Sequence, residues 1–580
     1  MRILLVHPED NPERGDWASQ HWDWVIDLGR AGPETYKRWG GLFGCAAEPL
    51  DILGVEEIRS IRTLIATGLG HVVDREGLDW WELNVMFFHQ KLEMQASLQT
   101  LVHQLGTEDQ LSLTRPGFHA DALKLLIGNR LKCFSGRVIS GVRGLNHYRR
   151  LWSKFPLPQI FEILEDKYDA DYALRRRFTP GKKPCPSAVV LLPSAYGNVS
   201  RTGIAYAKAS PETDFLLVAT RRSGRVANLS ANVSAAALAS YASPRRETRA
   251  EYESLAEQWH KLRGDLECVP EFELLGRLGV LDSFPRLLGQ GLGIREAWRR
   301  VLEREPVQAV LCADDSNPYT HIPLLLARSR GIPTIACHHG ALDGRHLFKR
   351  NHADVIFAKG RMEEDYLVRV CGVSPEVVEM GAPARELSSQ VVTHQMKQRA
   401  PIVFFSEAYE IAGGRGEEFY GELLPPLAGL AARTGRSLVI KLHPAESRRE
   451  RERLVKRLLP PEQQRLTRIV NGPLTDELLD GARFGVTIRS TVVMECALLG
   501  IPCFLCEWLE YGPYGYLQQF SRFGAGYGLK SVAEIGEIPR ILQGWTPKPE
   551  KVRDLWQGIA PGRFRELISG RRMLQQAVAI

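Results

Sequence analysis

Residues 309–339 read AVLCADDSNPYTHIPLLLARSRGIPTIACHH, and this stretch decides the fold class. The apolar runs 309–315 and 333–339 have the length and composition of buried β-strands, and residues 321–331 between them have helical spacing. A strand, a helix and another strand in this order form the βαβ unit of a parallel sheet. Similar runs occur at 188–194, 214–220, 354–360 and 377–383. The sequence therefore predicts an α/β domain.

A second series of apolar runs begins after the polar stretch 386–400. Its expected strands are 401–407, 437–444, 465–470, 484–490 and 502–508, separated by helical patterns. We expect two Rossmann-like domains, an N-terminal one over 1–395 and a C-terminal one over 396–580 that ends in helices.

The beginning of the chain departs from this alternation. Residues 2–8 and 24–29 predict two strands, but between about 34 and 175 apolar residues recur at helical spacing, as in 81–105. We expect a helical insertion in the N-terminal domain.

Composition is that of a globular protein, with 44% hydrophobic residues, 25% charged residues and a net charge of +7. Apolar runs stay short of the roughly 18 residues that a membrane span needs, and the start MRILLVHPED predicts a strand rather than a signal peptide. We expect a cytoplasmic protein with reduced cysteines. The basic balance suits anionic substrates or peripheral binding at the inner face of a membrane, although the acids interleaved with the bases at 446–457 favour a solvated helix face there. Without a recognition motif we expect no nucleic-acid partner.

Polar residues follow three expected strands of the second domain, at the edge where parallel sheets bind ligands. In KLHP, His443 can donate to a phosphate oxygen, although backbone carbonyls could hold it instead. In TIRSTVVMECALLGIP, Ser490 and Thr491 begin a helix whose free N–H groups favour an anion, and both hydroxyls can also cap that helix. The candidate binding residues here are Ser406, Glu407, Lys441, His443, Pro444, Arg489, Ser490, Thr491 and Glu495.

In the first domain, TIACHHGALDGRH contains several metal-ligand types. The spacing matches no zinc signature, and adjacent strand residues point to opposite faces, so His338 and His339 are not expected to bind one ion. We expect no metal, with His338 packed inward and His339 lining a cleft, where Gly340 allows a close backbone approach.

Other motifs are weak. Asp169 and Asp171 form a DxD in a charged helical pattern, which favours a solvated face, and Cys503 and Cys506 lie in an apolar strand, which favours buried thiols. Phosphate-binding P-loops, dinucleotide-binding glycine motifs and hydrolase nucleophile elbows are not found in the sequence.

The order of these motifs resembles GT-B-fold glycosyltransferases of bacterial surface polysaccharide synthesis. His339-Gly340 matches the HG motif of the CDP-glycerol glycerophosphotransferases. His443-Pro444 and Ser490-Thr491 match the HP motif and the Ser/Thr pair of those enzymes, of the polysialyltransferases and of the capsule Kdo transferases. The resemblance spans about residues 300–510 and lacks the D/E-D/E-G motif of the polysialyltransferases.

This resemblance implies a metal-independent glycosyltransferase without a cofactor, whose second-domain motifs hold the phosphates of a CMP-, CDP- or UDP-linked sugar, such as CMP-activated Kdo or sialic acid. It implies a base from the first domain, for which His339 and Asp343 are candidates, with Asp16 as a third. The acceptor would be a surface glycan, a lipid-linked molecule or a protein.

Two alternatives remain open at this point. The UDP-GlcNAc 2-epimerases share the two-domain layout and need no acceptor site. A non-catalytic protein of a polysaccharide-assembly complex would tolerate the loss of His443 and Ser490, whereas a transferase would not.

Overall fold

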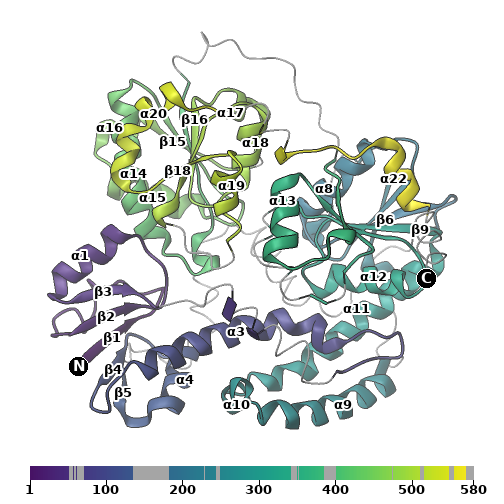
Figure 1. Ribbon diagram of the computed structural model, residues 1–580, viewed down its shortest axis with the longest axis horizontal. Coiled ribbons are helices and arrows are strands. Elements are labelled where there is room, and N and C mark those ends of the chain that lie inside the picture. Colours follow the sequence, from purple (N-terminus) through teal and green to yellow (C-terminus); the bar gives the residue numbers. More distant parts are fainter. Residues whose placement is uncertain are drawn as a thin grey trace. The chain divides into compact units, whose positions relative to one another are not determined.

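The computed structural model describes residues 1–50, 56–57, 60–61, 71–134, 182–226, 229–242, 248–340, 342, 346, 349–350, 352–383, 400–472, 474–509, 515–547, 551 and 554–569. The chain divides into two compact units (Figure 1). The first comprises residues 1–54, 93–156 and 387–553, and the second comprises residues 55–92, 157–386 and 554–580.

All three sheets of the described chain are parallel, which confirms the α/β class. The second unit holds the seven-stranded sheet β12-β11-β10-β9-β6-β7-β8, and the first unit holds the six-stranded sheet β15-β14-β13-β16-β17-β18. In both, the chain-order pattern begins 3-2-1-4-5-6 from one edge, which is the strand order of a Rossmann fold. The expectation of two Rossmann-like sheets is therefore confirmed.

The strands of the seven-stranded sheet are β6 (Val189–Ser194), β7 (Phe215–Ala219), β8 (Val233–Ala237), β9 (Val307–Cys312), β10 (Thr334–Ala336), β11 (Val355–Ala358) and β12 (Val378–Met380). Its unit contains the helices α8 (Gly197–Lys208), α9 (Arg249–Glu267), α10 (Pro270–Arg277), α11 (Phe284–Arg304), α12 (Pro318–Arg328), α13 (Arg361–Asp365) and α22 (Pro561–Ile568).

The strands of the six-stranded sheet are β13 (Ile402–Phe405), β14 (Leu438–Lys441), β15 (Thr467–Val470), β16 (Phe484–Thr487), β17 (Cys503–Cys506) and β18 (Tyr527–Leu529). Its helices are α14 (Gly416–Arg433), α15 (Arg448–Leu458), α16 (Pro461–Leu466), α17 (Asp476–Asp480), α18 (Val492–Leu498), α19 (Gln518–Arg522) and α20 (Ile538–Gly544).

The N-terminal residues form a third sheet, β3-β2-β1-β4-β5, which corrects the expectation of a helical insertion. Its strands are β1 (Arg2–Val6), β2 (Trp24–Asp27), β3 (Ala46–Pro49), β4 (Gln110–Leu113) and β5 (Leu131–Cys133). The helices α1 (Pro33–Phe43), α3 (Trp80–His103) and α4 (Phe118–Ile127) confirm only part of that expectation. Strands β3 and β5 contain no buried residue, and β4 has four residues close after α3, so none of them forms a separate apolar run that the sequence would reveal. The strands β1 and β2 join this sheet instead of the first Rossmann-like domain.

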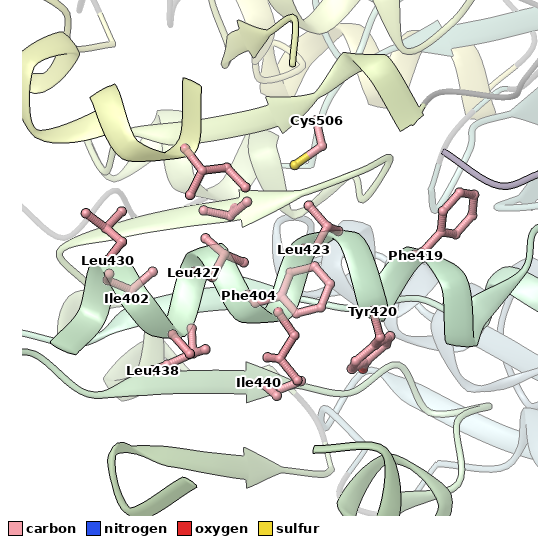
Figure 2. Close-up of a cluster of buried hydrophobic side chains, with 14 of the residues drawn as sticks. Ile402, Phe404, Phe419, Tyr420, Leu423, Leu427, Leu430, Leu438, Ile440 and Cys506 are labelled. Carbon is pink, nitrogen blue, oxygen red and sulfur yellow. The ribbon is translucent and has the colours of Figure 1, made fainter. Parts of the chain in front are cut away.

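Helix α14 supplies one side of the core beneath the six-stranded sheet (Figure 2). Its residues Tyr420, Leu423 and Leu427 are fully buried against Phe404 and Ile440 of β13 and β14. The spacing of three and four residues places them on one face of the helix, so the helix is held on the sheet mainly by apolar burial.

Arg415 joins the N-terminal sheet to the residues that precede α14. Its guanidinium is 2% exposed and donates to both carboxylate oxygens of Asp27, at 2.7–2.9 Å. It also donates to the backbone carbonyls of His7 at 3.0 Å and Asp10 at 2.6 Å. These acceptors follow β1 and end β2, so one side chain binds the carboxyl ends of these two strands.

A second contact joins the same two parts of the first unit. The carboxylate of Glu422 in α14 accepts hydrogen bonds from the amide and the hydroxyl of Thr35, at 2.9 and 2.8 Å. Thr35 lies in the first turn of α1, where a negative charge is favourable.

We expect Asp27→Ala to lower the free energy of unfolding by about 3–5 kcal/mol, because it leaves a buried guanidinium without its carboxylate. Urea denaturation, with hydrogen exchange in β1 and β2, measures the loss. The control is Glu13→Ala, which removes the exposed pair with Arg38 and should cost less than about 1 kcal/mol. Equal effects of the two variants would contradict the role given to Arg415.

Candidate functional site

The carboxyl ends of β13, β14 and β16 bring the expected residues of the second domain to one edge. Strand β13 lies between β14 and β16, so the gap between β13 and β16 is the point where the strand order reverses and where such sheets bind ligands. The Thr487 hydroxyl donates to the Phe405 carbonyl at 3.0 Å, and the Arg489 Nε lies 3.5 Å from a Glu407 oxygen. Of the sequence-predicted set, Glu407 after β13 and Arg489 after β16 are therefore in contact across this point.

His443 has a defined proton arrangement at this edge. Its Nδ1 accepts a hydrogen bond from the Ala445 amide at 3.1 Å. A neutral imidazole has one protonated nitrogen, so the proton lies on Nε2 and makes that atom a donor. The loss of water around the ring lowers the pKa of His443, and the positive charge of Lys441 lowers it further, so the neutral ring is favoured. The residue is exposed, so the donor can reach a ligand.

Glu446 fixes the turn that carries His443, and sequence reasoning missed it. Its Oε2 accepts from the His443 amide at 2.8 Å, and its own amide donates to the His443 carbonyl at 3.0 Å. Its Oε1 accepts from the Ser406 hydroxyl and from Arg451 Nε, both at 2.8 Å. Burial raises the pKa of the Glu446 carboxyl, against the influence of Arg451. The sequence feature that could have indicated Glu446 is its position three residues after the histidine of KLHP.

Two predicted ligand groups are engaged within the protein. The Lys441 ammonium donates to the carbonyls of Leu442 and Gly472, both at 2.8 Å, and burial lowers its pKa. The Ser406 hydroxyl is buried between Glu446 and Tyr420, whose hydroxyl donates to it at 2.7 Å. These groups hold the shape of the edge.

The helix α18 begins beside this edge. The Ser490 hydroxyl accepts from the Val492 amide at 3.4 Å, and the Ser490 amide donates to Thr487 Oγ1 at 3.1 Å. Thr491 stands at the N-cap but its side chain makes no capping bond, so the expected double cap is wrong for Thr491. Glu495 lies half-buried in the first turn of the helix, and Pro444 is exposed beside His443.

The second unit has its own strand-order reversal, between β6 and β9. Tyr196, after β6, donates its hydroxyl proton to Asp314 Oδ2, after β9, at 2.5 Å. The same hydroxyl lies 3.2 Å from His339 Nε2, and the two rings meet edge to face at 5.1 Å. Tyr196 comes from a part of the sequence that gave no signal for this site.

The two adjacent histidines lie closer together than strand geometry predicts. Strand β10 ends at Ala336, so alternation does not extend to them, and their ring centroids are 4.8 Å apart. The expectation that they point to opposite faces is therefore wrong. His338 is buried and its Nδ1 accepts from the Gly340 amide at 3.1 Å, whereas His339 is half-buried. Within the described residues, no three His, Cys, Asp or Glu side chains form a group that could hold a metal.

The structure describes only some of the remaining predicted residues. Asp16 is exposed in the loop after β1, where its carbonyl accepts from Gln20 at 3.3 Å. Asp343 lies outside the described residues, as do Asp169 and Asp171. Cys503 and Cys506 are buried thiols of β17, as predicted.

Beside His339, Asp315 and Lys349 form a buried ion pair at 2.5 Å. Burial alone would raise the pKa of Asp315, but the Lys349 ammonium and the neighbouring His346 and His321 hold it well below its ordinary value. This pair stabilises the loop after β9 at the point where Asp314 meets Tyr196.

No family model matches the sequence, and no curated protein matches it. Solved structures match in fold alone. The UDP-GlcNAc 2-epimerase of Methanocaldococcus jannaschii matches over 68% of this chain and 99% of its own, at 12% identity and a TM-score of 0.37. The calicheamicin glycosyltransferase CalG4 matches over 68% of this chain and 97% of its own, at 13% identity and a TM-score of 0.37. The wall teichoic acid polymerase TagF matches over 74% of this chain and 99% of its own, at 12% identity and a TM-score of 0.37.

We expect the stabilisation from Asp315 to be pH-dependent. A carboxyl group whose pKa is lowered on folding contributes fully above the unfolded-state value of about 4 and loses that contribution as the pH falls. The melting temperature of Asp315→Asn should lie below that of the native chain at pH 7, and the gap should narrow below pH 4. The exposed Asp282→Asn is the control. A gap that stays constant with pH would contradict this account.

Proposed function

We propose that this chain is a metal-independent glycosyltransferase that takes a sugar from a nucleotide donor. The observation behind this proposal is the exposed His443, whose Nε2 is set as a hydrogen-bond donor after β14, at the carboxyl edge of the six-stranded sheet and one strand away from the strand-order reversal. Together with Arg489, it offers positive charge and hydrogen-bond donors to a phosphate group.

In this proposal, the bond between the sugar and the donor phosphate breaks while the acceptor hydroxyl forms the new bond to the sugar. His443 and Arg489 stabilise the negative charge that develops on the leaving phosphate, as preorganised donors do in other enzymes. The donor carries CMP, CDP or UDP, and an acidic sugar such as Kdo or sialic acid suits the basic chain.

We assign the removal of the acceptor proton to His339. Tyr196 holds the ring through Nε2, and Asp314 in turn holds Tyr196. Histidine is the commonest general base in proteins because its pKa lies near neutral pH. Asp343 and Asp16 are the other proposed bases, and the acceptor is a glycan, a lipid-linked molecule or a protein.

We also propose that the chain works at the cytoplasmic face of a membrane as a peripheral protein. Across the described helices, none is long and apolar enough to cross a bilayer. On α15, Arg449, Arg453 and Lys456 are exposed on one helix face and form no ion pair with a described residue. Such a row of cations suits an anionic lipid surface.

A thermal-shift screen with CMP, CDP, UDP, GDP and TDP tests the donor site. We expect at least one nucleotide to raise the melting temperature of the native chain and to have a much smaller effect on His443→Ala, which lacks the phosphate donor. The matched variant His339→Gln should keep the shift but lose sugar transfer.

Absence of any nucleotide response would refute the transferase proposal. Conversion of UDP-GlcNAc without an acceptor would instead favour the epimerase alternative. Unimpaired biological function of His443→Ala would favour the non-catalytic alternative.

Co-sedimentation with vesicles tests the membrane proposal. Phosphatidylglycerol vesicles should bind the native chain, and phosphatidylcholine vesicles should not. Replacing Arg449, Arg453 and Lys456 together by Glu should weaken binding by about 100-fold or more, since each cation contributes about 1 kcal/mol near an anionic surface. Equal binding to both vesicle types would contradict the proposal.

A further inference from the structure

The turn after β14 is held by a network that reaches well beyond the turn itself. Glu446 is 4% exposed, and its carboxylate receives four hydrogen bonds or close polar contacts within 3.5 Å, from the His443 amide, Ser406, Arg451 and Tyr420. The two oxygens have separate tasks. Oε1 meets Ser406 and Arg451, whereas Oε2 meets the backbone of His443.

The outer partner of this network is Glu410. Its carboxylate accepts from Arg451 at 3.0 and 3.1 Å, and it is 52% exposed. Arg451 also stacks on the Tyr420 ring, with 4.8 Å between the guanidinium carbon and the ring centroid. Arg451 is therefore held from three sides, and it in turn fixes Glu446.

The consequence for His443 follows from the bonds along the turn. Glu446 holds the amide and the carbonyl of His443. With that backbone fixed, the Ala445 amide lies against His443 Nδ1 and confines the proton of the neutral ring to Nε2. A looser turn would release the Ala445 amide and allow the proton on either nitrogen.

We propose that Glu446 is the positioning residue of the donor site, which sets His443 in the tautomer that donates to the nucleotide phosphate. This inference rests on the function proposed above for His443. Glu446 acts through the backbone of the turn and does not itself face the phosphate, because both of its oxygens are occupied by protein donors.

Glu446→Gln tests this role. Ser406 and Arg451 both require an acceptor, so the amide carbonyl of Gln should take the place of Oε1. The amide NH2 then faces the His443 N–H, donor against donor, and the bond that holds the turn is lost. Glu410→Gln is the matched control, because it changes the same residue type in the same network and leaves the bonds from Glu446 to His443 intact.

Two measurements on these variants report on the inference. Long-range proton–nitrogen spectra of chains labelled with ¹⁵N-histidine show the tautomer of His443, whose signals are assigned by their loss in His443→Gln. We expect the native chain and Glu410→Gln to show the Nε2–H form, and Glu446→Gln to show a mixture. Calorimetric titration with CMP, CDP and UDP should show an affinity at least about tenfold lower in Glu446→Gln.

Glu446→Asp provides a second variant in case Glu446→Gln does not fold. It keeps the buried charge beside Arg451 but is one methylene shorter, so it cannot span from Arg451 to the His443 amide. A native tautomer in the folded Glu446 variants, or a native nucleotide affinity despite a changed tautomer, would overturn the inference. A native chain that binds none of the three nucleotides would overturn the proposed function, while the spectra still decide whether Glu446 controls the tautomer.

Discussion

The buried guanidinium of Arg415 is the interaction on which the first unit depends. It is bonded to Asp27, 388 residues earlier in the chain, and to carbonyls at the ends of β1. A charge removed from water is tolerated only when its donors are satisfied, and here the acceptors come from the edge of another sheet. This requirement makes residues 1–54 and 387–553 parts of one compact unit although they are distant in sequence.

The two Rossmann-like sheets place different chemistry at their carboxyl edges. At the carboxyl edge of the six-stranded sheet, His443 after β14 is a hydrogen-bond donor, and the cation Arg489 after β16 pairs with Glu407 after β13. Where the strand order reverses in the seven-stranded sheet, a hydroxyl joins a carboxylate to an imidazole, through Tyr196, Asp314 and His339. The first combination suits a phosphate, and the second suits the handling of a proton. This difference is why we assign donor binding and base catalysis to separate units.

The sequence predicted the strands that are buried throughout, such as β6, β7 and β13, because each lies in a continuous apolar run. It did not predict β3, β4, β5, β8 and β18: β3 and β5 have no buried residue, β8 and β18 have one each, and β4 follows closely on a helix. Among the site residues, His443 and Ser490 could be predicted from the sequence because they follow closely on such apolar runs. Glu446 and Tyr196 could not be predicted, because their roles depend on hydrogen bonds to other elements. Glu446 bonds to Ser406, and Tyr196 bonds to Asp314, which lies 118 residues further along the chain.

The dependence of β1 and β2 on Arg415 also has a consequence for synthesis of the chain. Ribosomes add about 5–20 residues per second, so the partner of Asp27, 388 residues downstream, is made roughly 20–80 s later. During that interval the carboxyl edge of the N-terminal sheet has its carbonyls and the Asp27 carboxylate in water. The carboxyl edge at β1 and β2 therefore gains its Arg415 contacts only after most of the chain has been synthesised.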